Sequence, residues 1–216
     1  THKTSSAASD VYKRQQEKIY VSPYNDPQII AGQGTLAIEL LDQLPRLDVV
    51  YVSIGGGGLI SGIGCVLKAF SPRTRVVGVS AKNSAELAAS IRAGKMVKVD
   101  HFETLADGCA GGVDNDTITL GLGSEVIDDL IDCSEGQIEV GLQQIAWNEK
   151  MLVEGSAGLA YAAWQEDASN NKNKISAVVL CGANFDQETL SPIFNRDYIE
   201  IRIKILQLKT KFIFLS

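Results

Sequence analysis

The chain alternates between short runs of consecutive apolar residues and longer segments in which apolar residues recur every three or four positions. Runs of the first kind indicate strands buried on both faces, and segments of the second kind indicate amphipathic helices. Strands are expected in four stretches: IYVSPY (19–24), LDVVYVSI (47–54), RVVGVS (75–80) and ISAVVLCG (175–182).

The helical pattern fills the segments between these strands. Helices are expected over 26–44, with an interruption near Gly32 and Gly34, and over 57–70, 84–94, 134–150 and 156–164. Gly94 is expected to close its helix, and Ser134 to cap the next long one. Strands that alternate with helices indicate parallel strands joined by crossovers. The pattern therefore predicts an α/β fold with a doubly wound, mostly parallel sheet.

Both ends of the chain depart from this pattern. Residues 1–15 are polar without a helical or strand period and are expected to be a disordered or foreign leader. Residues 196–216 alternate apolar with basic and other polar residues, and form an atypical tail. The expected domain is therefore residues 16–195.

Composition narrows the classes of function. The 216 residues carry a net charge of −6, which disfavours a nucleic-acid or anionic membrane surface. No stretch reaches the roughly 18 apolar residues of a membrane span, and the start of the chain has no apolar signal core. Four cysteines form no C-x-x-C pair, and His2 and His101 are too few to complete a zinc site with them. These features favour a reduced, cytoplasmic protein.

The most informative short stretch is SIGGGGLISG, residues 53–62. Gly55, Gly56, Gly57 and Gly58 lie between a predicted strand and a predicted helix. Unpaired amides at a helix N-terminus bind anions, and glycine lets a phosphate approach the backbone closely. The alternative is a tight turn without a ligand, for which one or two glycines would suffice.

The spacing of the glycines excludes two common phosphate ligands. No Gly-Lys-Ser/Thr follows the loop, which rules out a P-loop. No register completes G-x-G-x-x-G, and Ser80 stands where a carboxylate that binds the ribose of NAD would be expected. A phosphate ligand of another kind is therefore favoured.

Five blocks resemble one known family. They are SPYNDPQIIAGQGTLAIEL, SIGGGGLISGI, LADGCAGG, LVEGSAGLA and VVLCGANFD, and they follow the order and spacing of threonine/serine dehydratases and serine racemases. The resemblance implies pyridoxal 5′-phosphate as cofactor and the tryptophan-synthase-β-like fold (fold type II). It also implies that the chain holds an incomplete, C-terminal part of the larger domain.

The resemblance also implies roles for individual residues. Gly55–Gly58 and Leu59 match the segment that binds the cofactor phosphate. Cys181 matches a residue that hydrogen-bonds the pyridine nitrogen, where a neutral partner favours elimination at Cβ. Its alternative role is that of a small buried core residue. Glu154 matches a carboxylate near the cofactor ring, or else is an acid that caps the following helix.

A divalent cation is a weaker expectation. Racemase-like members bind one through an acidic residue on the strand after the glycine loop, and this chain has Ser80 there. The carbonyl of Ser84 and the side chain of Glu86 remain as candidate ligands.

The lysine that binds the cofactor covalently in this family has no counterpart in the chain. Lys3 and Lys13 lie in the leader, Lys18 precedes the first predicted strand, and the other lysines lie in predicted helices, turns or the tail. Without this lysine the chain is expected to be an inactive fragment of an ammonia-lyase that converts threonine or serine to a 2-oxo acid. The alternatives are a racemase or related dehydratase of the same fold, and a non-catalytic half-domain that binds a phosphorylated ligand. A homodimer is a further expectation from the resemblance.

Overall fold

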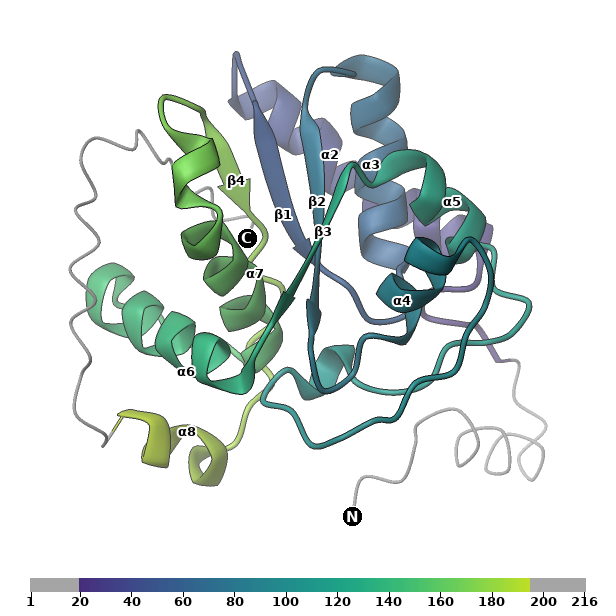
Figure 1. The fold of residues 1–216 in the computed structure, drawn as a ribbon. Helices are drawn as coiled ribbons and strands as arrows, with labels where there is room; N and C mark the ends of the chain where they lie inside the picture. Colours follow the sequence, from purple (N-terminus) through teal and green to yellow (C-terminus); the bar gives the residue numbers. More distant parts are fainter. Residues whose placement is uncertain (1–19, 195–216) are drawn as a thin grey trace.

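A computed structural model describes residues 20–194, so the predicted leader and tail lie outside the described part. The labels follow Figure 1. The helices are α2 (Pro27–Gln43), α3 (Gly58–Phe70), α4 (Glu86–Ala93), α5 (Thr119–Val126), α6 (Glu135–Gln144), α7 (Gly155–Glu166) and α8 (Gln187–Phe194). The strands are β1 (Val49–Ser53), β2 (Arg75–Ala81), β3 (Asp129–Cys133) and β4 (Ser176–Val178). Within residues 20–194, no helix has the length and apolar character needed to cross a bilayer.

The four strands form one parallel sheet in the order β3-β2-β1-β4. β1 lies inside the sheet, with Val49 opposite Arg75 of β2 on one edge and opposite Ser176 of β4 on the other. The predicted α/β fold with a parallel sheet is confirmed.

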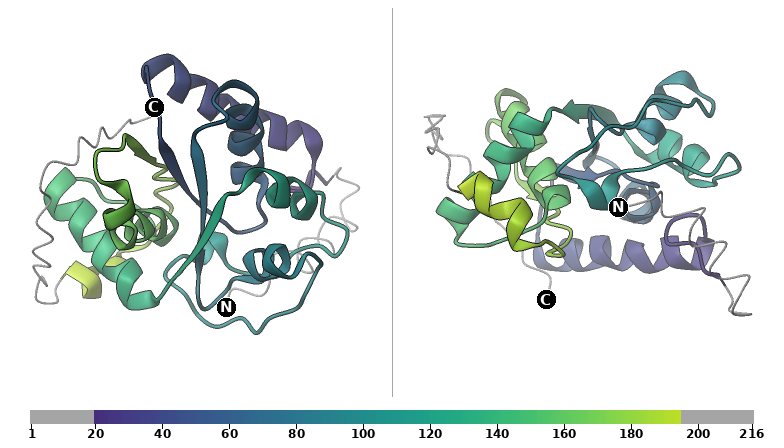
Figure 2. Two further views of the ribbon diagram at one scale, coloured as in Figure 1. Left: turned by 45° about the horizontal axis from the view of Figure 1, so that its top comes forward. Right: turned by 90° about the horizontal axis from the view of Figure 1, so that it is seen from below.

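The two faces of the sheet are covered by different helices. Val49 and Tyr51 belong to an apolar cluster with side chains of α6, α7 and α8, whereas Val50 and Val52 pack with those of α2 and α3. Figures 1 and 2 show α6 and α7 packed side by side, apart from α2 and α3. All five residues of β1 are buried, as a strand covered on both faces requires.

The expected interruption of the first helix is wrong, because α2 is continuous through both glycines. Gly34 lies against α3, where a Cβ atom added to it would stand 3.1 Å from the carbonyl oxygen of Gly62. A Cβ added to Gly62 would stand 2.3 Å from the carbonyl oxygen of Ile30. The glycines thus allow two helix backbones to approach closely rather than breaking α2.

Two of the expected strands differ from the structure. Residues 20–24 form no strand; Ser22 Oγ instead accepts a hydrogen bond from the amide of Asn25 at 2.9 Å, which bends the chain around Pro23. The last strand is shorter than 175–182, since β4 ends at Val178 and only the amide of Val179 continues the pairing, to Tyr51 O. β3 lies in a stretch for which no strand was expected.

The helix ends follow the expected local chemistry. Ser134 forms a capping box with Gln137 at the start of α6, and Gly94 ends α4 in the left-handed conformation at φ 66°. Asp26 caps α2 by accepting from two backbone amides. The segment predicted as one helix over 134–150 changes from α6 to a π-helix at Ile145–Glu149.

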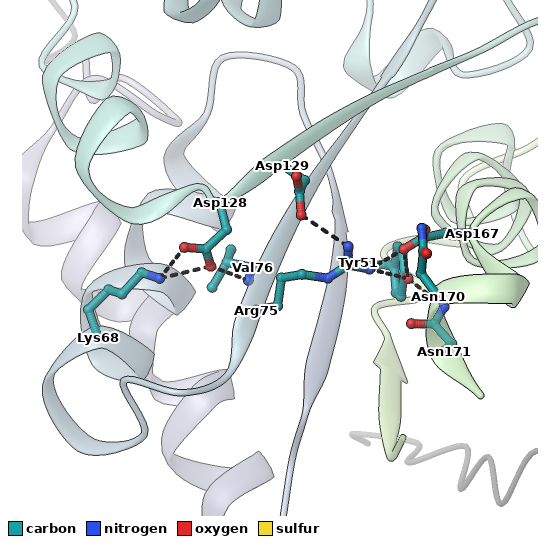
Figure 3. A network of polar contacts seen from close by, with 9 residues as sticks. All are labelled: Tyr51, Lys68, Arg75, Val76, Asp128, Asp129, Asp167, Asn170 and Asn171. Atoms are coloured by element: carbon teal, nitrogen blue, oxygen red, sulfur yellow. Dashed lines mark hydrogen bonds and ion pairs between the residues drawn. The ribbon is translucent and has the colours of Figure 1, made fainter. Parts of the chain in front are cut away.

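A buried polar network joins the sheet to the segment that follows α7 (Figure 3). Tyr51 donates its hydroxyl proton to Asp167 at 2.5 Å, and the same carboxylate accepts from Arg75 and from Asn170. Asn171 donates to the Tyr51 hydroxyl at 2.6 Å. Burial raises the pKa of Asp167, but the hydrogen bonds from Tyr51, Asn170 and Arg75 outweigh it and hold this pKa below its usual value.

The lowered pKa of Asp167 makes stability depend on pH. Its contribution is complete above the unfolded carboxyl pKa of about 4 and is lost as pH falls through the lower folded value. We expect Asp167→Asn to lower the free energy of unfolding at neutral pH by about 2–3 kcal/mol, because Arg75 loses a buried counter-charge. Urea unfolding at several pH values measures both effects. Asp116→Asn, at an exposed site, is the control, and equal unfolding curves for the two variants would contradict the expectation.

Candidate functional site

The topology marks one place in the sheet as the candidate site. The chain runs from β1 to β2 to β3 in one direction and then returns to place β4 on the other side of β1. In open parallel sheets, ligands bind beyond the carboxyl ends of the strands where the order reverses. Here that place lies between the segments that leave β1 and β4, which carry Gly55–Gly58 and Cys181 respectively.

The glycine segment presents unpaired backbone amides. Helix α3 begins at Gly58, and the first amide of its ladder is that of Ser61, which donates to Gly57 O at 3.0 Å. The amides of residues 55–60 donate to no acceptor within residues 20–194. With the positive end of the helix dipole, they form a binding site suited to an anion such as a phosphate group.

The backbone of this segment requires glycine at its centre. Gly57 is the N-cap of α3 with φ +85°, and a Cβ atom added to it would stand 2.3 Å from Leu87 Cδ2. A Cβ added to Gly56 would stand 2.2 Å from Cγ of the Tyr24 ring. Thr119 Oγ1 donates to Gly56 O at 2.7 Å, so the loop is held by Thr119 as well as by the contacts with Leu87 and Tyr24. The protein's own packing therefore uses part of the space that the missing side chains leave.

Cys181 lies three residues beyond the end of β4 and is half-buried. Burial raises the pKa of its thiol to about 12, with the nearby Cys109 and Glu154 adding to the increase, while a hydrogen bond with Ser53 lowers it in part. The thiol is therefore neutral at pH 7, so it can exchange hydrogen bonds with a ligand but offers no negative charge.

Glu154 occupies the N-cap position of α7, but its side chain makes no capping hydrogen bond. Its Oε2 instead accepts from the amide of Asn184 at 2.8 Å, and its own amide donates to Gly182 O at 3.3 Å. The carboxylate is thus tied to the segment that carries Cys181. Glu154 therefore stands at the start of α7 without capping it through its side chain, and its role near the cofactor ring stays a prediction.

Three further residues belong to this region and were not found from the sequence. Ser53, the last residue of β1, donates to Ser156 O at 2.6 Å and so joins β1 to the start of α7. Cys109 lies beside the glycine segment, where a Cβ added to Gly55 would stand 3.0 Å from its Cα. Burial raises the pKa of the Cys109 thiol to about 11, and the negative charges of Glu154 and Asp107 add to the increase. The only signal in the sequence that could have found these residues is that each lies within one of the motif blocks that resemble the family.

The candidate cation ligands do not fit a divalent metal ion. Burial raises the pKa of Glu86, yet hydrogen bonds from Lys98, the amide of Val113 and His101 hold it below its usual value. Both of its carboxylate oxygens therefore already have partners. At Ser84 the hydroxyl, a different atom from the carbonyl oxygen expected as a ligand, contacts His101 Nδ1 at 2.8 Å. Within the described residues, no group of three or more His, Cys, Asp or Glu side chains could hold a metal ion.

Comparison with known proteins gives consistent matches. The profile of a family described as pyridoxal-phosphate dependent enzyme matches residues 1–182. An L-threonine ammonia-lyase of Thermotoga maritima is 34% identical over 195 residues, which make up 89% of this chain and 48% of that protein. The chain spans about half the length of the curated relatives it matches.

Solved structures show the same likeness. The processed form of threonine deaminase isoform 2 from Solanum lycopersicum superposes with a TM-score of 0.78 at 27% identity, covering 85% of this chain and 54% of that one. Maize serine racemase superposes with a TM-score of 0.76 at 28% identity, covering 86% of this chain and 57% of that one.

The left-handed conformation of Gly57 leads to a testable difference between two glycines. We expect Gly57→Ala to lower the free energy of unfolding by about 1–3 kcal/mol, because φ +85° strains a residue with a Cβ and Leu87 must move. Gly121→Ala in α5 is the matched control, since a Cβ added there meets nothing within 4 Å. Chemical denaturation compares the two variants, and a loss at Gly121 as large as that at Gly57 would contradict the assignment.

Proposed function

Because this chain belongs to the family of pyridoxal-phosphate dependent enzymes, we propose that it supplies the phosphate-binding half of an ammonia-lyase that acts on threonine or serine. The observation that carries the proposal is the row of unpaired amides at residues 55–60, at the reversal of strand order. A neutral thiol at the end of the neighbouring strand adds a second point of contact for the same ligand.

The residues present fit pyridoxal phosphate. The amides of Gly55–Leu59 and the start of α3 suit the phosphate dianion. Cys181 suits the pyridine nitrogen, because a neutral thiol makes a hydrogen bond there without stabilising a full positive charge on the ring. When bound, the cofactor supplies an electron sink for the pair left on the substrate's Cα when its proton is removed.

The residues on the α7 side orient such a ligand rather than react with it. Glu154 is positioned by the amide of Asn184 and faces the segment of Cys181. Ser53, through its bond to Ser156, sets the distance between the end of β1 and the start of α7. Glu154 and Ser53 would thus hold a bound ring at a fixed place between the ends of β1 and β4.

The names of the relatives support a proposal for the substrate. The Thermotoga maritima protein is named as a threonine ammonia-lyase and the tomato structure as a threonine deaminase, which favours threonine. The likeness to maize serine racemase supports a racemase as the second candidate. A non-catalytic half-domain that binds a phosphorylated ligand is the third, because no lysine of the chain stands in the family's covalent segment.

Binding of pyridoxine 5′-phosphate tests the proposal directly, since this probe carries the ring and phosphate but lacks the aldehyde that reacts with lysines. We expect saturable binding to the full chain at one site, weakened about five- to tenfold by Cys181→Ala through loss of one hydrogen bond. Cys65→Ala, at an exposed cysteine of α3, is the matched control. Calorimetry gives the affinities, and inorganic phosphate is expected to compete. Equal affinities for the two variants would contradict the role of Cys181.

An assay for release of a 2-oxo acid tests whether the chain lacks a catalytic lysine. We expect the chain mixed with pyridoxal phosphate and threonine to release no 2-oxo acid, because no positioned base removes the Cα proton. Borohydride reduction followed by mass spectrometry of peptides should show no single lysine labelled stoichiometrically. Turnover together with one labelled lysine would show that the chain carries its own catalytic base.

A further inference from the structure

A nearly inaccessible carboxylate, that of Glu86, begins α4, the helix that follows β2. The Glu86 side chain is only 2% exposed, so its charge has to be compensated inside the protein. Its Oε1 accepts from Lys98 Nζ at 2.9 Å and from the amide of Val113 at 3.0 Å. Its Oε2 contacts His101 Nε2 at 2.9 Å. Both oxygens are therefore bound by groups from a later part of the chain.

The same groups connect three separate segments. Lys98 Nζ also donates to the carbonyl oxygen of Val113 at 3.3 Å. Ser84 Oγ contacts His101 Nδ1 at 2.8 Å and accepts from the amide of Gly111 at 3.0 Å. The cluster thus joins residues 84–86 to residues 98–101 and 111–113.

The joined segment continues to the glycine loop. Cys109 lies against Gly55, and the amide of Asp114 donates at 3.1 Å to the hydroxyl of Tyr24, whose ring packs on Gly56. Residues 109–114 therefore form one wall of the candidate site. The cluster around Glu86 contacts this wall directly, through the amides of Gly111 and Val113.

Two sources could neutralise a buried carboxylate at this position, a divalent metal ion or a side chain of the protein. Ca²⁺ takes six to eight oxygen ligands and Mg²⁺ takes six. Beside Glu86 stands Lys98, whose positive charge repels a metal ion, and the neighbouring strand offers the neutral Ser80. The Lys98 ammonium has three donors, and Glu86 and the carbonyl of Val113 already accept from it.

We propose that the Lys98 ammonium is the resident cation of this site, neutralising Glu86 in place of a divalent metal ion and holding the wall 109–114 against the glycine segment. Lys98 is thus a positioning residue. The inference rests on the contacts among the chain's own groups and does not depend on the proposed function.

Mn²⁺ binding to the full chain tests the proposal, with the loss of the electron paramagnetic resonance signal of free Mn²⁺ as the readout. The Lys98 side chain is 62% exposed, so an ion can reach the site. We expect wild type to bind Mn²⁺ only weakly and without stoichiometry, and Lys98→Met to bind it with a dissociation constant at least about tenfold lower, because a repelling charge next to the carboxylate is removed. Adding Glu86→Gln to Lys98→Met should abolish the gain.

Lys95→Met is the matched control, since Lys95 is exposed just beyond α4 and its loss leaves Glu86 paired. Stoichiometric binding of Mn²⁺ by wild type that Glu86→Gln removes would overturn the proposal, because the site would then be a metal site. A folded Lys98→Met protein that gains no binding would overturn it as well.

Thermal unfolding keeps the proposal testable if Lys98→Met is poorly stable. We expect this variant to melt below Lys95→Met, and Mn²⁺ to raise its midpoint but not that of wild type. Lys98→Arg, which keeps the charge, should melt above Lys98→Met and show no response to Mn²⁺. Equal midpoints for Lys98→Met and Lys95→Met, or failure of both Mn²⁺ and arginine to restore stability, would overturn the proposal.

Discussion

The candidate site depends on the pairing of β1 along both of its edges. Because β2 and β4 bind opposite edges of this strand, the chain crosses from one side of the sheet to the other after β3. β1 leads to α3 on one face, whereas β4 leads to α8, which packs in the cluster of α6 and α7 on the other face. The unpaired amides after β1 and the thiol of Cys181 therefore come to the same end of neighbouring strands from opposite sides.

Buried charges lie at both ends of β2 and are compensated differently. At its start, Arg75 contacts Asp167 and Asp129, in a network that also includes the hydroxyl of Tyr51. Beyond its end, Glu86 is paired with Lys98 and His101, both from a single later segment. The first cluster joins the sheet to the segment after α7, and the second joins it to the wall of the glycine loop. The two clusters thereby fix β2 relative to the elements on either side of it.

Much of this structure could be predicted from patterns among neighbouring residues. The features that depend on contacts between residues distant in sequence could not. The apolar run 47–54, the helix after the glycines and the cap at Ser134 follow from neighbouring residues, and all three are confirmed. Gly34 was misread because its partner, Gly62, is distant in sequence and the pattern cannot show that two backbones meet. For the same reason, the sequence did not show that Lys98 pairs with Glu86, twelve residues away, or that Ser53 donates to Ser156. The roles of Cys181 and Glu154 in binding remain predictions.

The contact between Gly34 and Gly62 has a mechanical consequence for the phosphate-binding amides. The backbones of α2 and α3 approach closely at this point, so α3 cannot move towards α2 without pushing directly on its backbone. The amides at the start of α3 are thus supported by a direct contact between two helix backbones. A rearrangement that shifts the anion site towards α2 therefore has to displace this seventeen-residue helix as well.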